Sequence, residues 1–235
     1  MSVEPSENSF RFSEAQEPVF YGKAHRFCSY MVERKPIWNR SLHVEGIENF
    51  PPEGPAVIAP THRAFWDPTY VGIISPRALY SMTKKELWMW TRPHLRPFGF
   101  LVGRLGGFPV NRQRPGPSTM KYGAEVLRNG GVVMTFPEGT SKRRGEKIYD
   151  LFEGVGQLAV NASFENPCPL IPVGIASENL RRGETVHLVI GEALYPKGYS
   201  KNIKARRSLA EELTDELEIN LQEAYNQALA LRKSE

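Results

Sequence analysis

Long apolar stretches are absent from this chain of 235 residues. No run of about 18 apolar residues occurs, which a membrane-crossing helix needs. The first residues, MSVEPSENSF, also lack the basic start and the apolar centre of a secretory signal. We therefore expect a protein that neither spans a membrane nor is exported by the usual route.

Cysteine is scarce. The two cysteines, Cys28 and Cys168, lie far apart, form no CxxC motif and have no histidine at ligand spacing. This excludes a disulfide framework and a zinc ribbon, and it favours a reducing compartment. No metal or redox cofactor is expected.

The shares of charged residues, glycine and proline are all moderate. Apolar residues make up 40% of the chain and charged residues 24%, with 20 glycines and 19 prolines. These values exclude a disordered tail protein, a collagen-like repeat and a multi-span membrane protein. The length suits one domain, with or without an appended helical element.

Basic residues are concentrated between positions 77 and 114, although the net charge is only +4. The basic residues there are Arg77, Lys84, Lys85, Arg92, Arg96, Arg104, Arg112 and Arg114. Aromatic residues alternate with them: Tyr80, Trp88, Trp90, Phe98, Phe100 and Phe108. The mixture predicts a surface that meets phosphates and an apolar phase together, as at an anionic membrane. An ordinary solvated loop is the plain alternative. Nucleic acid is not expected as a partner, because no nucleic-acid motif follows.

Hydrophobic periodicity predicts an α/β fold with a mixed, largely parallel sheet flanked by helices. Residues 1–17 are expected to be a disordered tail, and 18–40 an N-terminal amphipathic helical segment that Pro36 stops. Residues 41–235 form the main domain. Strands are predicted at 41–46, 54–60, 78–82, 132–136, 169–175 and 186–190. Helices are predicted at 118–128, with Ser118 as the N-cap, at 155–164 and at 205–231.

The segment Thr61-His62-Arg63-Ala64-Phe65-Trp66-Asp67-Pro68 follows the apolar strand AVIAP. On a continuous helix, the offset of five positions would turn Asp67 about 140° away from His62. Direct pairing therefore needs a non-helical turn, and Pro68 predicts that a helix begins there. A histidine with one ring nitrogen held by a carboxylate can act as a base through the other.

A nucleophilic serine is not evident. No GxSxG motif surrounds any serine, and neither cysteine has an activating local setting. An acyl-enzyme intermediate is therefore not favoured, and the substrate itself is expected to supply the hydroxyl. Taken alone, His62 and Asp67 could equally be satisfied loop residues.

Three further segments follow in a fixed order: GFPVNR (Gly107–Arg112), FPEGT (Phe136–Thr140) and IPVG (Ile171–Gly174). With the HxxxxD segment they resemble the four blocks of the glycerolipid acyltransferases, specifically the 1-acylglycerol-3-phosphate (lysophosphatidic acid) acyltransferases. The segment Thr83–Leu87 also looks like a stretch of that family. The resemblance covers about residues 40 to 195.

The resemblance implies a role for each matching residue. His62 would be the general base and Asp67 the carboxylate that orients it. Arg112 matches the phosphate-binding arginine, and Glu138, Gly139 and Thr140 match the block that contacts the glycerol phosphate. Pro172 matches the block associated with the acyl donor.

One position departs from the family. Many members carry an arginine after the EGT triplet, whereas this chain has Ser141 followed by Lys142, Arg143 and Arg144. A shifted cation, such as Lys142 or Arg143, could bind the phosphate instead, and the sequence does not choose among the three. Acceptors with a different head group thus stay open.

The implied function is transfer of a fatty acyl group from an acyl thioester to lysophosphatidic acid, giving phosphatidic acid. The donor would be acyl-CoA or acyl carrier protein. The protein would be cytoplasmic and attached peripherally to the inner face of the membrane. Alternatives are acylation of glycerol 3-phosphate, of a glycolipid or of another lysophospholipid, and thioester hydrolysis. A binding module without turnover is the non-enzyme alternative.

Overall fold

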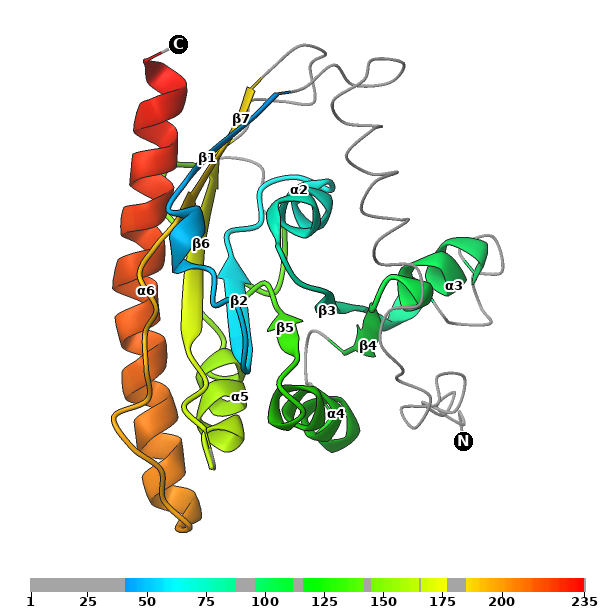
Figure 1. Cartoon of the computed structure of the whole chain (residues 1–235), viewed down its shortest axis with the longest axis vertical. Coiled ribbons are helices and arrows are strands. Elements are labelled where there is room, and N and C mark those ends of the chain that lie inside the picture. The colour runs from blue at the N-terminus through cyan, green and yellow to red at the C-terminus, as the bar shows by residue number, and fades with distance from the viewer. Residues whose placement is uncertain are drawn as a thin grey trace.

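The computed structural model describes residues 41–87, 96–111, 116–141, 145–164, 166–176 and 185–234 (Figure 1). The tail expected over residues 1–17 and the helical segment expected over 18–40 lie outside these ranges. Of the described residues, no helix is both long and apolar enough to cross a bilayer.

Seven strands of the described residues form one sheet in the order β1-β7-β6-β2-β5-β3-β4. Their bounds are β1 Ser41–Glu45, β2 Ala56–Pro60, β3 Leu79–Lys84, β4 Phe108–Val110, β5 Val132–Met134, β6 Leu170–Ala176 and β7 Thr185–Ile190. The five strands from β6 to β4 run parallel. Only the β6–β7 pair is antiparallel, and β1 joins β7 in parallel. The predicted mixed, largely parallel sheet is confirmed.

Helices cover both faces of this sheet. Their bounds are α2 Asp67–Ile74, α3 Arg96–Arg104, α4 Pro117–Arg128, α5 Gly154–Ala162 and α6 Ile203–Lys233, with short 3-10 turns η2 Ile47–Asn49 and η3 Lys85–Leu87. Side chains of α4, α5 and α6 share one buried apolar cluster with one set of strand residues, and Tyr70 and Val71 of α2 share a second cluster with the other set. The alternating side chains of the buried strands thus build two cores.

The helix α6 runs the length of the sheet (Figure 1). Asn202 caps it by accepting from the backbone N–H groups of Lys204 and Ala205. Apolar side chains are buried along the helix at Leu213, Leu217, Leu221 and Tyr225. The helix lies very close to β6, because a Cβ on Gly174 would come within 2.2 Å of the Ala224 carbonyl oxygen. Only glycine permits this approach.

Two local predictions were wrong or incomplete. The helix α4 begins at Pro117 with Gly116 as its N-cap, so Ser118 lies inside the first turn. A helix also forms at α3, which the sequence did not predict because Pro97, Gly99 and Gly103 are poor helix formers. The Gly99 position contacts the Leu87 carbonyl so closely that a Cβ would be 2.3 Å away, so packing against η3 outweighs propensity.

The predicted basic and aromatic surface is not continuous. Phe108 is fully buried and packs edge-on against Tyr122. Arg77 donates to the carbonyls of Pro51, Gly54 and Gly130 and so joins loops that precede strands. Burial lowers the pKa of Arg77. Both residues hold the fold together, and the expectation that they face a membrane was wrong.

The parallel strands fix where a site can form. The strands β2, β4 and β5 all end at one edge of the sheet, and the loops after them begin at Thr61, Asn111 and Thr135. In open α/β sheets, ligands bind at this carboxyl edge. Three of the four sequence motifs therefore meet there.

Candidate active site

The His62–Asp67 pair forms across a non-helical loop. Residues 61–66 follow β2 without helical structure, and α2 begins at Asp67, as predicted. His62 Nδ1 lies 3.1 Å from Asp67 Oδ2. A carboxylate at this ring nitrogen favours the tautomer with the proton on Nδ1 and leaves Nε2 as the proton acceptor.

Asp67 is itself firmly held. Its side chain is fully buried, and Oδ2 also accepts from the backbone N–H groups of Arg63 and Ala64, both at 2.6 Å. One carboxylate oxygen therefore fixes the histidine ring and the turn that carries it. This explains how two residues five positions apart can meet without a helix.

An apolar pocket lies beside the His62 ring. It is open on one side, and its space of about 600 Å³ includes the open solvent there. Its lining is His62, Met82, Val110, Met120, Thr135, Phe136, Pro137, Gly139, Phe152, Gly154, Val155 and Leu158. The Phe136 ring also stacks on the imidazole with 4.2 Å between centroids. The histidine thus faces a largely apolar cavity that opens to solvent.

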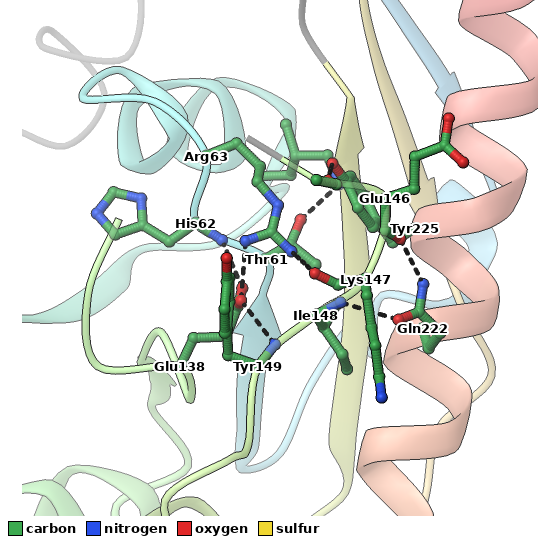
Figure 2. Close-up of polar contacts among 12 residues, drawn as sticks. Thr61, His62, Arg63, Glu138, Glu146, Lys147, Ile148, Tyr149, Gln222 and Tyr225 are labelled. Atoms are coloured by element: carbon green, nitrogen blue, oxygen red, sulfur yellow. Dashed lines mark hydrogen bonds and ion pairs between the residues drawn. The ribbon is translucent and has the colours of Figure 1, made fainter. Parts of the chain in front are cut away.

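Glu138 lies in the loop after β5 and supports the His62 loop. Its Oε1 accepts from the backbone N–H of His62 at 3.1 Å, and its Oε2 accepts from Arg63 Nη1 at 2.8 Å and from the Tyr149 N–H at 3.2 Å. The residue is only 3% exposed. Figure 2 shows the Arg63 side chain pointing to Glu138 while the His62 ring points the other way. The predicted substrate contact of Glu138 stays a prediction.

Arg63 is a buried cation. Burial alone would lower the pKa of its guanidinium, but the neighbouring Glu138 carboxylate and Tyr225 together outweigh this, and the pKa is raised. The guanidinium also lies over the Tyr225 ring of α6, 4.7 Å from its centroid. The charge is therefore balanced by a carboxylate and an aromatic face.

Of the other predicted substrate residues, some lie at the pocket and others do not. Gly139 lines the pocket with a left-handed φ of 65°, and Thr140 beside it is exposed. Pro172 lies buried within β6, opposite Ala59 of β2, and does not line the pocket. Arg112, Lys142 and Arg143 lie outside the described residues.

Sequence reasoning missed the residues that support the site from behind. Arg63 stood inside the HxxxxD segment, where an arginine beside a catalytic pair could have suggested an ion pair. Nothing in the pattern indicated that Gln222 and Tyr225 of α6 contact the loop that follows residue 144.

Cys168 contributes no nucleophile. Its side chain is fully buried, and burial raises its pKa to about 12, so the thiol is neutral at ordinary pH. Among the described residues, no three His, Cys, Asp or Glu side chains gather as a metal site would require.

With its candidate site at the carboxyl edge of a largely parallel sheet, the protein has the architecture of an α/β ligand-binding domain. A family model described as Acyltransferase matches residues 41–176, which is more than half of the chain. The chain belongs to the Acyltransferase family, and the resemblance seen in the four motifs is confirmed.

Two relatives of this chain are both named 1-acyl-sn-glycerol-3-phosphate acyltransferase. The chain is 29% identical over 210 residues to a 1-acyl-sn-glycerol-3-phosphate acyltransferase of Bacillus subtilis, covering 86% of this chain and 97% of the relative. It is 29% identical over 166 residues to the protein of that name from Pseudomonas aeruginosa, covering 66% of this chain and 60% of the relative.

A solved structure has the same fold. The crystal structure of the 1-acyl-sn-glycerophosphate (LPA) acyltransferase PlsC from Thermotoga maritima aligns with a TM-score of 0.55 at 21% identity. The alignment covers 88% of this chain and 78% of that one. At this identity the likeness establishes the fold.

Proposed function

We propose that the chain transfers a fatty acyl group from an acyl thioester to the free hydroxyl of lysophosphatidic acid, giving phosphatidic acid. The observation that carries this is the His62–Asp67 pair, with 3.1 Å between Nδ1 and Oδ2, beside an apolar pocket that His62 lines. Such a pair can activate a hydroxyl, and the apolar lining of the pocket suits an acyl chain. The names of the curated relatives support the same reaction.

The chemistry proceeds without an acyl-enzyme. His62 Nε2 takes the proton of the glycerol hydroxyl while its oxygen attacks the thioester carbonyl carbon. Asp67 stabilises the imidazolium that forms. When the tetrahedral intermediate collapses, the carbon–sulfur bond breaks and the imidazolium returns the proton to the leaving thiolate. General base help of this kind contributes about 10²- to 10⁴-fold in rate.

Acceptor phosphate needs cations near this base. Arg112 follows β4 by two positions, and Lys142 and Arg143 follow the FPEGT segment. Since β4 and β5 end at the same edge as β2, these cations are our candidates for the phosphate, with Gly139 and Thr140 beside the glycerol. An arginine fork suits a phosphate dianion.

The donor is assigned to the apolar pocket. Met82, Met120 and Leu158 give it an apolar wall that suits a fatty chain better than a polar substrate. We propose acyl-CoA or acyl carrier protein as the carrier and no further cofactor. Glu138 and Pro172 keep their proposed places in the substrate blocks, although their buried positions favour indirect roles.

Peripheral attachment to an anionic membrane on the cytoplasmic side completes the proposal. On α3, Phe100 and Leu101 are 64% and 53% exposed, and the Arg104 guanidinium lies over the Phe100 ring. Exposed apolar side chains beside a cation suit an interface where phosphates border an apolar phase.

The test is thioester consumption with long-chain acyl-CoA and separate acceptors: lysophosphatidic acid, glycerol 3-phosphate, a neutral lysolipid and none. Products are identified by mass, and each reaction is repeated with acyl carrier protein as the donor. We expect acceptor-dependent transfer to lysophosphatidic acid that falls about 10²- to 10⁴-fold in His62→Ala. His43→Ala is the matched control, since His43 lies on the edge strand β1 with a half-exposed side chain.

Other outcomes would change the assignment. Equal thioester loss without acceptor would favour a hydrolase, and transfer only to glycerol 3-phosphate or to the neutral lysolipid would correct the acceptor. Turnover that survives in His62→Ala would contradict the assignment of the base.

A further inference from the structure

The loop Gly145–Tyr149 has no regular secondary structure, yet side chains hold each of its five residues by a backbone group. The Tyr225 hydroxyl donates to the Gly145 carbonyl at 3.1 Å. Gln222 donates to the Glu146 carbonyl and accepts from the Ile148 N–H, both at 2.9 Å.

The other two bonds lead directly to the site. Arg63 Nη2 donates to the Lys147 carbonyl at 3.5 Å, and the Tyr149 N–H donates to Glu138 Oε2 at 3.2 Å. The same Glu138 carboxylate accepts from the His62 N–H. Figure 2 shows this continuous set of contacts from α6, through the loop, to the backbone of His62.

Tyr225 provides a second connection. Its ring lies under the Arg63 guanidinium, and Arg63 pairs with Glu138. Both routes from α6 therefore converge on one carboxylate, which holds the N–H of the residue that bears the base. The matched family region ends at residue 176, so α6 lies outside it.

We infer that Gln222 and Tyr225 are positioning residues for acyl transfer, which hold His62 in its working place through the loop Gly145–Tyr149 and the Arg63–Glu138 pair. They touch neither the pocket nor the His62 ring, so they act on the rate of the chemical step and leave thioester binding unchanged. The inference rests on the proposed function for its kinetic consequence, but the physical link can be measured without turnover.

The test compares Gln222→Met with Gln227→Met on the full chain. Gln222→Met keeps the length of the side chain and removes both loop bonds, whereas Gln227 is an exposed glutamine on the same helix. We expect kcat to fall about 10-fold in Gln222→Met with the thioester KM unchanged, because small displacements of a reacting group cost up to about 10²-fold. Gln227→Met should match the wild type.

Conservative variants separate the two routes. Gln222→Glu keeps an acceptor for the Ile148 N–H and should recover part of the lost kcat. Tyr225→Phe keeps the ring under Arg63 and loses the hydroxyl, with its bond to Gly145 and its interaction with Arg63, so it should be milder than Tyr225→Leu. A merely structural role would not produce this order while KM stays constant.

Hydrogen exchange followed by mass spectrometry measures the link itself. In Gln222→Met, we expect faster exchange both in the loop 145–149 and in the segment 61–67, with α4 unchanged. Faster exchange confined to 145–149, or an unchanged kcat, would overturn the inference. If the wild type transfers nothing to lysophosphatidic acid, the proposed function fails, while the exchange result still decides whether α6 supports the His62 loop.

Discussion

Arg63 and Glu138 form a buried ion pair with 2.8 Å between Nη1 and Oε2, although they are 75 positions apart in the chain. The pair joins the loop after β2 to the loop after β5, and these two strands are neighbours in the sheet. Since the carboxylate also accepts from the His62 N–H, the stability of the domain and the placement of His62, our proposed base, depend on the same carboxylate.

Glu138→Gln should therefore destabilise the domain. The amide leaves the Arg63 cation buried without its counter-charge, and breaking one side of a buried pair costs about 3 to 5 kcal/mol. Urea unfolding followed by circular dichroism measures the loss. Glu146→Gln is the control, because it breaks the exposed pair with Lys233 and should change the free energy of unfolding far less. Equal effects of the two substitutions would contradict the prediction.

The sequence predicted most of the sheet and the contact between His62 and Asp67, because both depend on local pattern. Alternating or continuous apolar residues marked the strands, and Pro68 marked the start of α2. The offset of His62 and Asp67 required a non-helical turn, which the structure contains.

What the sequence did not predict depends on contacts between distant segments. The loop Gly145–Tyr149 has no periodicity, and its bonds to Gln222 and Tyr225 exist only because α6 packs closely on β6. In the same way, Phe108 and Arg77 belong to a basic and aromatic stretch, but strand pairing and loop contacts turn them inward.

Gly139→Ala should lower activity more than stability. The Gly139 backbone has φ 65°, and a Cβ there would lie 2.3 Å from the Phe152 ring, which lines the pocket. The Phe152 ring must therefore move within the pocket. The left-handed backbone conformation costs an alanine only about 1 kcal/mol of folding free energy. Gly130→Ala is the matched control, with φ 75° and nothing within 4 Å of the new Cβ.

Both variants should lose similar free energy of unfolding, but only Gly139→Ala should lose kcat/KM, several-fold, for the acyl thioester. The double variant Gly139→Ala/Phe152→Ala should regain activity, because the ring that was displaced is gone. Equal activity of the two single variants would show that the ring does not control access to the pocket.

Met120→Trp should change chain-length preference. Met120 is partly buried and lines the pocket, so the larger indole side chain of tryptophan shortens the space available to an acyl chain. We expect kcat/KM to fall about 10-fold or more for a sixteen-carbon thioester and less for a ten-carbon one, since each buried CH₂ contributes about 0.8 kcal/mol. Ile219→Trp, at a position on α6 that is 70% exposed, should leave the ratio unchanged. A constant ratio in Met120→Trp would exclude this pocket as the acyl site.

Cys168 should be unreactive in the folded protein and dispensable for transfer. In a Cys28→Ser background, a thiol reagent at pH 8 should label Cys168 only after unfolding in urea, because burial raises the thiol pKa to about 12.

The folded state holds the Cys168 thiol proton between pH 9 and 12, while the unfolded thiol, with its ordinary pKa of 9.0, releases it. Stability must therefore fall as the pH rises through this interval, by at most about 1.4 kcal/mol per pH unit from this group. Cys168→Ala should remove that part of the slope and keep transfer activity. Loss of transfer in Cys168→Ala with the fold intact would instead favour a covalent acyl-enzyme and contradict direct attack by the acceptor hydroxyl.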